Sequence, residues 1–163
     1  MQALSAPQPL DTTHQLTAFD CGEPSLDDWL RRRALANHLS GASRTFVVTD
    51  LDGVVRGYYA LAAGALAHEM ATSAVRRNMP DPDPVPVMVL ARLAVDRRAQ
   101  GGRVGAALLQ DAVLRSQGVA RNAGVRALLV HALHERARQF YEHYGFQASP
   151  VHPMTLMLRL SPL

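Results

Sequence analysis

The chain has 163 residues, of which 48% are hydrophobic and 19% are charged. This balance suits one domain with a buried core and excludes a disordered tail, so we predict a single domain over residues 1–163. No apolar run approaches the roughly 18 residues of a membrane-spanning helix, and the first residues do not resemble a secretory signal. Because Cys21 is the only cysteine, no intrachain disulfide can form, and we expect a cytoplasmic protein without a membrane partner.

All basic residues are arginine: there are 17 of them against 14 acidic residues, and the net charge is +3. A guanidinium group grips phosphate with two parallel hydrogen bonds, which favours a nucleotide or nucleic-acid partner. The alternative is a GC-rich genome, which favours arginine codons whatever the function.

The first half of the chain predicts a strand, a helix and a hairpin. Ser25 and Asp28 have the spacing of a capping box at a helix start, and Gly41 is a plausible end for that helix. The turn over residues 50–53 has the Asp and Gly content of a hairpin. The expected elements are a strand at 15–19, a helix from 25 to 41, and strands at 45–49 and 54–63.

The second half alternates helices with apolar strands. Residues 72–78 look irregular, and Pro80, Pro82, Pro84 and Pro86 exclude a helix over the crossing that follows. The expected elements are strands at 87–95, 125–131 and 155–160, a helix at 104–117 ended by Gly118, and a helix at 135–144 ended by Gly145. The order β-α-β-β-β-α-β-α-β predicts an α/β fold with a mixed sheet.

A glycine-bearing loop between an apolar strand and a helix is the sharpest chemical signal. Residues 100–106 read Gln-Gly-Gly-Arg-Val-Gly-Ala. Unpaired N–H groups at such a helix start bind phosphate. The loop matches neither the Walker pattern nor the dinucleotide fingerprint, and a simple tight turn is the alternative interpretation.

The loop and a second motif, Phe-Tyr-Glu-His-Tyr-Gly-Phe at residues 140–146, occur in the order found in the GNAT superfamily of N-acetyltransferases, which this chain resembles. Arg103 stands where the family has its first motif glycine. Segments 19–22, 26–30, 43–48, 57–61, 86–96 and 124–132 resemble more closely the GNAT-fold toxins that acetylate aminoacyl-tRNA. The resemblance covers most of the chain.

The resemblance implies acetyl-CoA as co-substrate, with Tyr141 as the general acid that protonates the leaving thiolate. The implied cofactor-binding residues are Leu93, Ala94 and Val95 along the pantetheine, and Gln100, Gly101, Gly102, Arg103, Val104, Gly105 and Ala106 at the pyrophosphate. It also implies an antitoxin of the ribbon-helix-helix type and a possible homodimer. A helical aromatic stripe in the core is the alternative for Tyr141.

Arg33, Arg76, Arg77 and Arg92 are candidate tRNA contacts by the same resemblance, and a solvated basic surface is the alternative. Spacing of i,i+4 predicts that Asp27 and Asp28 pair with Arg31 and Arg32, which leaves Arg33 freer. The seven histidines show no ligand cluster, so no metal site is expected.

The predicted function is acetyl transfer from acetyl-CoA to the α-amine of aminoacyl-tRNA, which would block translation. No general base stands out, and an α-amine needs less help than a lysine because its pKa lies near neutrality. Two alternatives remain: an acetyltransferase for a small amine or a protein N-terminus, and a non-catalytic acyl-CoA-binding module.

Overall fold

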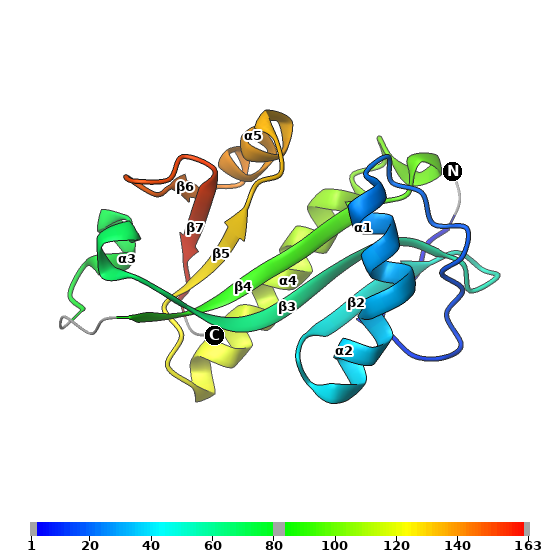
Figure 1. The fold of residues 1–163 in the computed structure, drawn as a ribbon, viewed down its shortest axis with the longest axis horizontal. Helices are drawn as coiled ribbons and strands as arrows, with labels where there is room; N and C mark the ends of the chain where they lie inside the picture. Colours follow the sequence, from blue (N-terminus) through cyan, green and yellow to red (C-terminus); the bar gives the residue numbers. More distant parts are fainter. Residues whose placement is uncertain (1–2, 80–83, 162–163) are drawn as a thin grey trace. The chain divides into compact units, whose positions relative to one another are not determined.

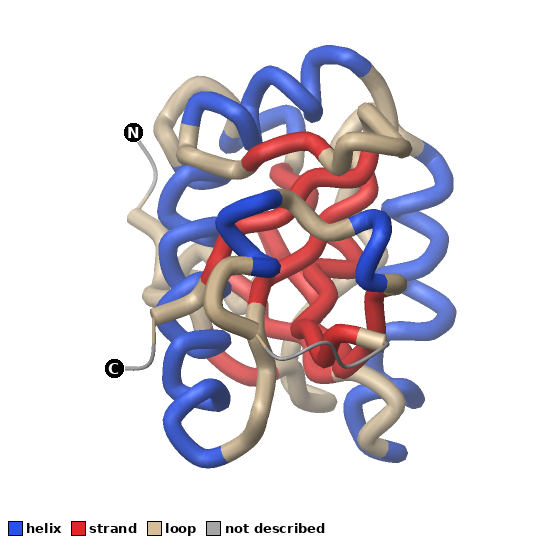
Figure 2. The backbone as a smooth tube through the Cα atoms, turned by 90° about the vertical axis from the view of Figure 1, so that its left-hand side faces the viewer, coloured by secondary structure: helices blue, strands red, loops and turns tan. Residues whose placement is uncertain are grey.

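The computed structural model describes residues 3–79 and 84–161. Within them the strands follow the order β1-β2-β3-β4-β5-β7-β6 in a mixed sheet. Figure 1 labels most of the elements, and Figure 2 colours helices, strands and loops separately. The strands are β1 (Gln8–Pro9), β2 (Arg44–Thr49), β3 (Val55–Leu66), β4 (Val85–Val95), β5 (Ala127–His131), β6 (Gln147–Ala148) and β7 (Thr155–Arg159). The α-helices are α1 (Pro24–Trp29), α2 (Leu35–Ser40), α3 (Ser73–Arg76), α4 (Val104–Asn122) and α5 (Glu135–His143). A π-helical segment, η1 (Leu30–Ala34), joins α1 to α2, and η2 (His68–Met70) and η3 (Arg97–Ala99) are 3₁₀ turns.

The chain divides into two compact units. The first unit comprises Met1–Ala62 and Ala91–Ala112, and the second comprises Ala63–Leu90 and Val113–Leu163. Strands β3 and β4 and helix α4 each contribute residues to both units. The α/β fold class predicted from the element pattern is confirmed.

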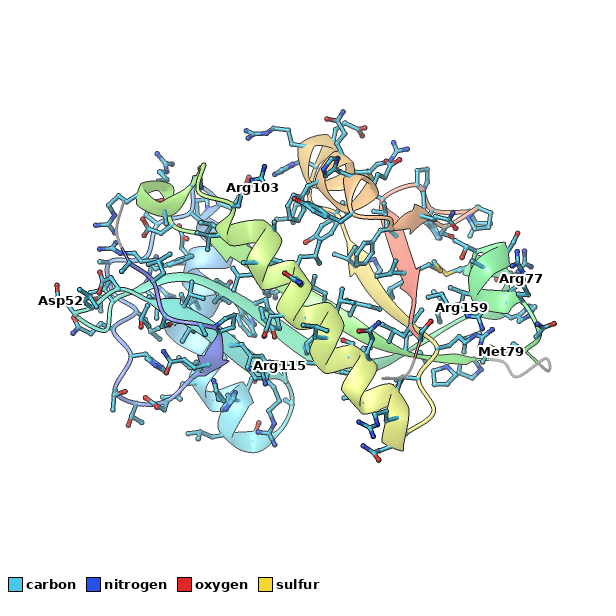
Figure 3. All side chains as sticks on the ribbon, turned by 180° about the vertical axis from the view of Figure 1, so that it is seen from behind. Asp52, Arg77, Met79, Arg103, Arg115 and Arg159 are labelled. Carbon is cyan, nitrogen blue, oxygen red and sulfur yellow. The ribbon has the colours of Figure 1, made fainter. Side chains whose placement is uncertain are left out.

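Successive residues of β3 point to opposite faces of the sheet, and in the first unit both faces are covered by helices. Tyr58 is fully buried in a cluster with Phe19 and Leu30, next to α1. Its neighbour Tyr59 bonds through its hydroxyl to the carboxylate of Asp111 on α4. Figures 1 and 3, drawn from opposite sides, show α1 and the start of α4 on opposite faces of β3.

Close approach of α4 to β3 explains a glycine in the middle of that strand. A Cβ atom on Gly57 would lie 3.1 Å from the side chains of Leu108 and Val48 and 3.3 Å from that of Val104. Gly57 therefore lets the first turns of α4 lie directly on the strand.

The second unit is built around β5, which pairs in parallel with β4 over Val87–Leu90 and antiparallel with β7. Its core cluster consists of apolar residues from the strands and from the segment around α3: Leu66, Ala71, Val75, Val85, Val87, Ala127, Leu129 and Met157. Among the helices of the described residues, none is long and apolar enough to cross a membrane.

The predicted strand at 15–19 is wrong. Only Gln15 forms an isolated bridge, with Val54, and the edge position beside β2 is taken by β1. The predicted capping box is also wrong, because Pro24 begins the helix and Glu23 is its N-cap without a side-chain hydrogen bond.

Helix α4 runs through Gly118 to Asn122, four residues beyond the predicted stop. A helical glycine costs only about 1 kcal/mol, which the packing of a long helix can outweigh. The segment predicted as irregular contains α3, which Thr72 caps by accepting from the Val75 amide. Gly41 and Gly145 end their helices with φ of 82° and 92°, as predicted.

The proline crossing is only partly visible. Pro80 and Pro82 lie outside the described residues, and β4 already begins at Val85, so that Pro86 belongs to the strand. Pro86 has no amide hydrogen, but its carbonyl accepts from the Arg126 amide at 2.8 Å.

Candidate active site

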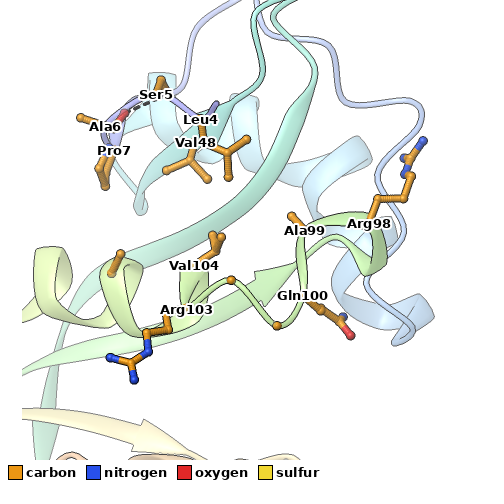
Figure 4. A pocket seen from close by; sticks show the side chains of 13 residues that line it. Leu4, Ser5, Ala6, Pro7, Val48, Arg98, Ala99, Gln100, Arg103 and Val104 are labelled. Carbon is orange, nitrogen blue, oxygen red and sulfur yellow. Dashed lines mark hydrogen bonds between the residues drawn. The ribbon is translucent and has the colours of Figure 1, made fainter. Parts of the chain in front are cut away.

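The glycine-bearing loop leads from the end of β4 through η3 to the start of α4, as predicted, and Figure 4 shows it from close by. Gly101 has φ of 87°, and Arg103 has φ of 62° although it carries a side chain. A left-handed conformation costs a non-glycine residue about 1–2 kcal/mol. This left-handed conformation explains why a glycine is expected at position 103. Arg103 adopts the same conformation at a cost in strain.

The loop leaves main-chain donors free at the start of α4. The first bond into the helix runs from the Ala107 amide to the Arg103 carbonyl at 3.1 Å. The amides of Val104, Gly105 and Ala106 therefore have no intrahelical acceptor. With the positive end of the helix dipole they form a site that suits a phosphate group.

Gln100 braces the loop through its side chain. Its amide nitrogen donates to the carbonyl of Val95 at 2.9 Å and to that of Cys21 at 3.2 Å. The side chain predicted at the pyrophosphate is therefore engaged in holding the loop to β4 and to the segment before α1.

Asp96, directly after β4, is an anchor that sequence reasoning missed. Its carboxylate is fully buried and accepts from the Asp20 amide at 3.1 Å, the Arg98 amide at 2.9 Å and the Arg98 Nε at 3.0 Å. Burial alone would raise the pKa of Asp96, but hydrogen bonds from Arg98 and from main-chain amides outweigh it and hold the pKa below its usual value. An Asp between an apolar strand and an arginine pair was the available signal.

A cavity of about 740 Å³ lies beside this loop in the first unit. One wall is the loop itself from Arg98 to Val104, and Figure 4 shows the chain segment at residues 4–7 on the other side. That segment is fixed because the Ser5 amide donates to the Thr49 carbonyl at 2.8 Å and the Thr49 amide donates to Ser5 Oγ at 3.0 Å. No motif in the sequence pointed to these N-terminal residues.

The predicted pantetheine residues occupy the last part of β4. Leu93, Ala94 and Val95 lie beyond Leu90, where the ladder with β5 ends. Ala94 is buried at 5% exposure, and the Val95 carbonyl is the group to which Gln100 donates.

Tyr141 lies on α5 in the second unit, whereas the loop belongs to the first. Its ring is buried at 6% exposure between Phe140 and Phe146, with ring centroids 5.2 and 5.5 Å away. Its hydroxyl makes no hydrogen bond to any of the described residues. Burial raises the pKa of Tyr141, so the phenol keeps its proton at neutral pH.

The arginines of the first helical segment differ from the predicted pairing. Arg31 bonds to Asp28 at 3.1 Å and to the Phe19 carbonyl at 2.7 Å, while the Asp27 carboxylate accepts from the Cys21 amide. Within the described part of the chain, Arg32 and Arg33 are both exposed without an ion pair. Arg33 is unpaired as expected, but the predicted pairing of Asp28 with Arg32 is wrong, so Arg33 is no freer than Arg32.

The pair Arg76 and Arg77 ends α3 in the second unit, and Figure 3 labels Arg77 there. Arg126 holds this end of the helix: its Nε donates to the Val75 carbonyl at 2.9 Å, and its Nη2 donates to the Arg77 carbonyl. Asn78 follows with φ of 57°, which turns the chain after the arginines.

Neither a metal nor a reactive thiol has support in the described residues. No group of three or more His, Cys, Asp or Glu is placed there to hold a metal ion. Burial, with a hydrogen bond to Asp27, raises the pKa of Cys21 to about 12, which leaves the thiol protonated and a poor nucleophile. His131 bonds to Thr155 through Nδ1 at 3.0 Å, within the β5–β7 pair.

Comparison with known proteins identifies the family to which the chain is similar. Residues 41–148 match the family model described as "Acetyltransferase (GNAT) domain". The "tRNA-acetylating toxin" of Mycobacterium tuberculosis (strain ATCC 25618 / H37Rv) is 55% identical over 158 residues, which are 97% of this chain and 93% of that protein.

Solved structures agree with this similarity. The structure of AtaT complexed with acetyl-methionyl-tRNAfMet matches with a TM-score of 0.88 at 26% identity, covering 96% of this chain and 95% of that chain. A mutant AtaT toxin bound to the C-terminus of the antitoxin AtaR and acetyl-CoA matches with a TM-score of 0.79 at 27% identity, covering 96% and 93%. The chain therefore belongs to the GNAT family of acetyltransferases.

Proposed function

We propose that this chain transfers the acetyl group of acetyl-CoA to the α-amino group of aminoacyl-tRNA and thereby blocks translation. The observation that carries the proposal is the 55% identity, over nearly the whole chain, to a tRNA-acetylating toxin. The free main-chain amides at the start of α4 and the unpaired arginines agree with two anionic ligands, a CoA diphosphate and an RNA backbone.

The residues at the start of α4 suit the diphosphate of acetyl-CoA. The amides of Gly101, Gly102 and Arg103 and those of Val104, Gly105 and Ala106 supply neutral donors at the positive end of a helix. Main-chain groups of Leu93, Ala94 and Val95 accompany the pantetheine in the proposed arrangement, and one of their N–H groups polarises the thioester carbonyl. The AtaT structure that contains acetyl-CoA supports this co-substrate.

In the reaction the amine nitrogen attacks the thioester carbon, so that a C–N bond forms and the C–S bond breaks. The nitrogen loses a proton, and the departing sulfur gains one. We assign the donation toward sulfur to the hydroxyl of Tyr141, which stays protonated because burial raises its pKa. An α-amine has a pKa of roughly 7.7–8.0 and is partly neutral at cytoplasmic pH without a dedicated base.

Arg33, Arg76, Arg77 and Arg92 are the proposed tRNA contacts. In the described residues Arg33 has no anionic partner, and Arg77 is exposed at the end of α3. Binding through such contacts releases counterions, so affinity for tRNA falls steeply with salt. The AtaT complex with acetyl-methionyl-tRNA supports tRNA as the class of acceptor.

The proposal extends to partners and location. The AtaT structure with the antitoxin AtaR supports an antitoxin as partner, and we propose one of the ribbon-helix-helix type. We also propose that residues 1–163 act as one domain, that the enzyme works in the cytoplasm, and that it forms a homodimer, which sedimentation of the purified protein tests directly.

Labelled acetyl-CoA tests the substrate class. The protein is incubated with it in the presence of aminoacyl-tRNA, uncharged tRNA, or free amino acids and peptides. We expect label on aminoacyl-tRNA only. Label on free amines at equal rates would favour an acetyltransferase of small amines or protein N-termini, and acetyl-CoA binding without any transfer would favour a non-catalytic module.

A further inference from the structure

Two side chains of the first unit, those of Arg92 and Tyr58, contact the ring of Trp29. The guanidinium carbon of Arg92 lies 4.9 Å from the centroid of the Trp29 ring. The Trp29 ring also stacks on Tyr58, with centroids 6.1 Å apart and ring planes within 11° of parallel. Tyr58 is fully buried, and its hydroxyl donates to the Leu26 carbonyl at 2.7 Å. Trp29 is thus held against the buried Tyr58, and the Arg92 beside it is partly exposed.

Within residues 3–79 and 84–161, Arg92 has no ion-pair partner that would neutralise its charge. Its Nη1 donates to the Ala91 carbonyl at 3.1 Å, and its Nε is enclosed without a partner among the described residues. An enclosed donor without an acceptor costs stability, and the ring contact returns only about 0.5–2 kcal/mol. This arrangement is poor for stability alone and leaves a cation ready for an anionic ligand.

The helix that supplies Trp29 adds further positive charge. Trp29 directly precedes the π-helical segment Leu30–Ala34, and such segments occur often at functional sites. Arg33 follows Trp29 by four residues, which places both on the same side of the helix. Arg33 is exposed and has no ion-pair partner in the part of the chain that the structure describes.

An aromatic plane, a guanidinium plane and unpaired cations together are the chemistry that binds single-stranded nucleic acid. Unpaired bases stack on aromatic rings and on guanidinium planes, and arginines take the phosphates between them. A double-stranded segment would offer phosphates but no open base for the stack.

We propose that Trp29 and Arg92 form the binding site for the unpaired 3′ end of the tRNA, with Arg92 contacting the RNA and Trp29 positioning the guanidinium. This inference rests on the proposed function, because the ligand is the acceptor end of the proposed substrate. It gives Trp29 a role that the sequence analysis had not assigned to it, and it assigns Arg92 to the single-stranded end of the substrate.

Trp29 is the only tryptophan of the chain, so its fluorescence reports this site alone. The probe is a short ribo-oligonucleotide with the unpaired 3′ sequence of tRNA, titrated without acetyl-CoA. We expect a saturable change in emission whose midpoint shifts to higher oligonucleotide concentration as salt rises. Binding of a labelled oligonucleotide without any change in Trp29 emission would overturn the proposal.

Replacement of Arg92 provides the second readout. Because stacking is worth about 1–3 kcal/mol per base, we expect Arg92→Ala to weaken oligonucleotide binding about tenfold. Arg121→Ala is the control, since it also removes one arginine, an exposed one, but lies on α4 in the second unit. If both variants lose the same oligonucleotide affinity, Arg92 acts only as a general surface charge, and the proposed site is refuted.

Replacement of Trp29 tests positioning against mere packing. We expect Trp29→Leu to raise KM for aminoacyl-tRNA about tenfold with little change in kcat, and Trp29→Phe to restore most of the affinity because it keeps an aromatic face. Acetyl-CoA affinity measured by calorimetry should be the same in all three proteins. A loss in kcat alone, or equal effects of Leu and Phe, would contradict a positioning role.

The outcomes separate this inference from the proposed function. If the wild-type protein acetylates aminoacyl-tRNA but Trp29 gives no oligonucleotide-dependent signal, the inference is contradicted and the proposed function stands. If the oligonucleotide binds at Trp29 but no acetyl group is transferred to aminoacyl-tRNA, the proposed function is contradicted and the binding site stands.

Discussion

The side-chain amide of Gln100 donates to the carbonyl oxygen of Val95 at 2.9 Å, so the loop before α4 is fastened to the strand from which it leaves. A second bond from the same nitrogen reaches the Cys21 carbonyl at 3.2 Å. One side chain therefore sets the position of a loop whose main-chain amides are the proposed phosphate donors.

Loss of this brace should weaken cofactor binding more than stability. A neutral hydrogen bond contributes about 0.5–1.5 kcal/mol, so we expect Gln100→Ala to raise the Kd for acetyl-CoA about fivefold in calorimetry. Gln110→Ala, an exposed glutamine further along α4, is the control and should leave the Kd unchanged. Identical affinities for the two variants would mean that the loop keeps its shape without Gln100.

Replacing Arg103 separates backbone strain from side-chain charge. With φ of 62°, position 103 suits glycine, so Arg103→Gly should raise the free energy of unfolding by about 0.5–1 kcal/mol in urea titrations, after the entropy of the freer unfolded chain is subtracted. Arg103→Ala keeps the strain and should give no such gain. If both variants bind acetyl-CoA more weakly by the same factor, the arginine side chain contributes to phosphate binding. A loss of stability in Arg103→Gly would disprove the strain.

Asp96 should stabilise the first unit through its buried carboxylate. Asp96→Asn leaves Arg98 without its charged partner, and we expect unfolding to become easier by about 2–3 kcal/mol, whereas Asp52→Asn in an exposed turn should have no measurable effect.

The pH dependence follows from the sign of the shift. The pKa of Asp96 is lower in the folded protein than in the unfolded chain. The carboxylate therefore makes its full contribution to the free energy of unfolding above the unfolded pKa of about 3.9, and this contribution is lost as the pH falls through the folded pKa. The stability of Asp96→Asn should therefore fall less steeply below pH 4 than that of the wild type. Parallel acid limbs in denaturation curves would contradict this assignment.

Tyr141 should matter for turnover but not for folding. Removal of a general acid typically costs about 10²–10⁴ in rate, and we expect Tyr141→Phe to lose at least a hundredfold in single-turnover acetylation with an unchanged melting temperature. Tyr144→Phe, in which an exposed tyrosine at the end of the same helix loses its hydroxyl, should retain full activity.

The pH dependence of activity provides a further test of Tyr141. Because burial raises the pKa of Tyr141, ionisation of its phenol should cause no decline in activity between pH 7 and the ordinary tyrosine pKa of about 10. Full activity of Tyr141→Phe would exclude it as the acid.

Much of the fold could be predicted because its signals are local. Apolar runs marked β4 and β5, aspartate and glycine marked the β2–β3 turn, and Gly41 and Gly145 marked helix ends by conformations that few other residues adopt. The loop at 100–106 and the motif around Tyr141 were likewise visible, since each is a contiguous run of residues whose chemistry depends on short spacing.

Where local signals competed with distant contacts, the sequence misled. Residues 15–19 have strand-like composition, yet Gln8 and Pro9 occupy the place beside β2. Gly118 looked like a helix end, but α4 continues beyond it. Asp27 was expected to pair along its helix and instead accepts a bond from the Cys21 amide.

By itself, then, the sequence determined the family pattern, the order of the main elements and the position of the glycine-bearing loop. Only the tertiary structure decided that Asp96 anchors the loop to Asp20, that Arg103 takes a left-handed conformation, and that Trp29 supports Arg92. The Asp96–Asp20 and Trp29–Arg92 contacts join residues more than 60 positions apart, and Arg103 lies in the loop between β4 and α4. No local pattern encodes such geometry, because it arises from the packing of elements that are distant in the chain.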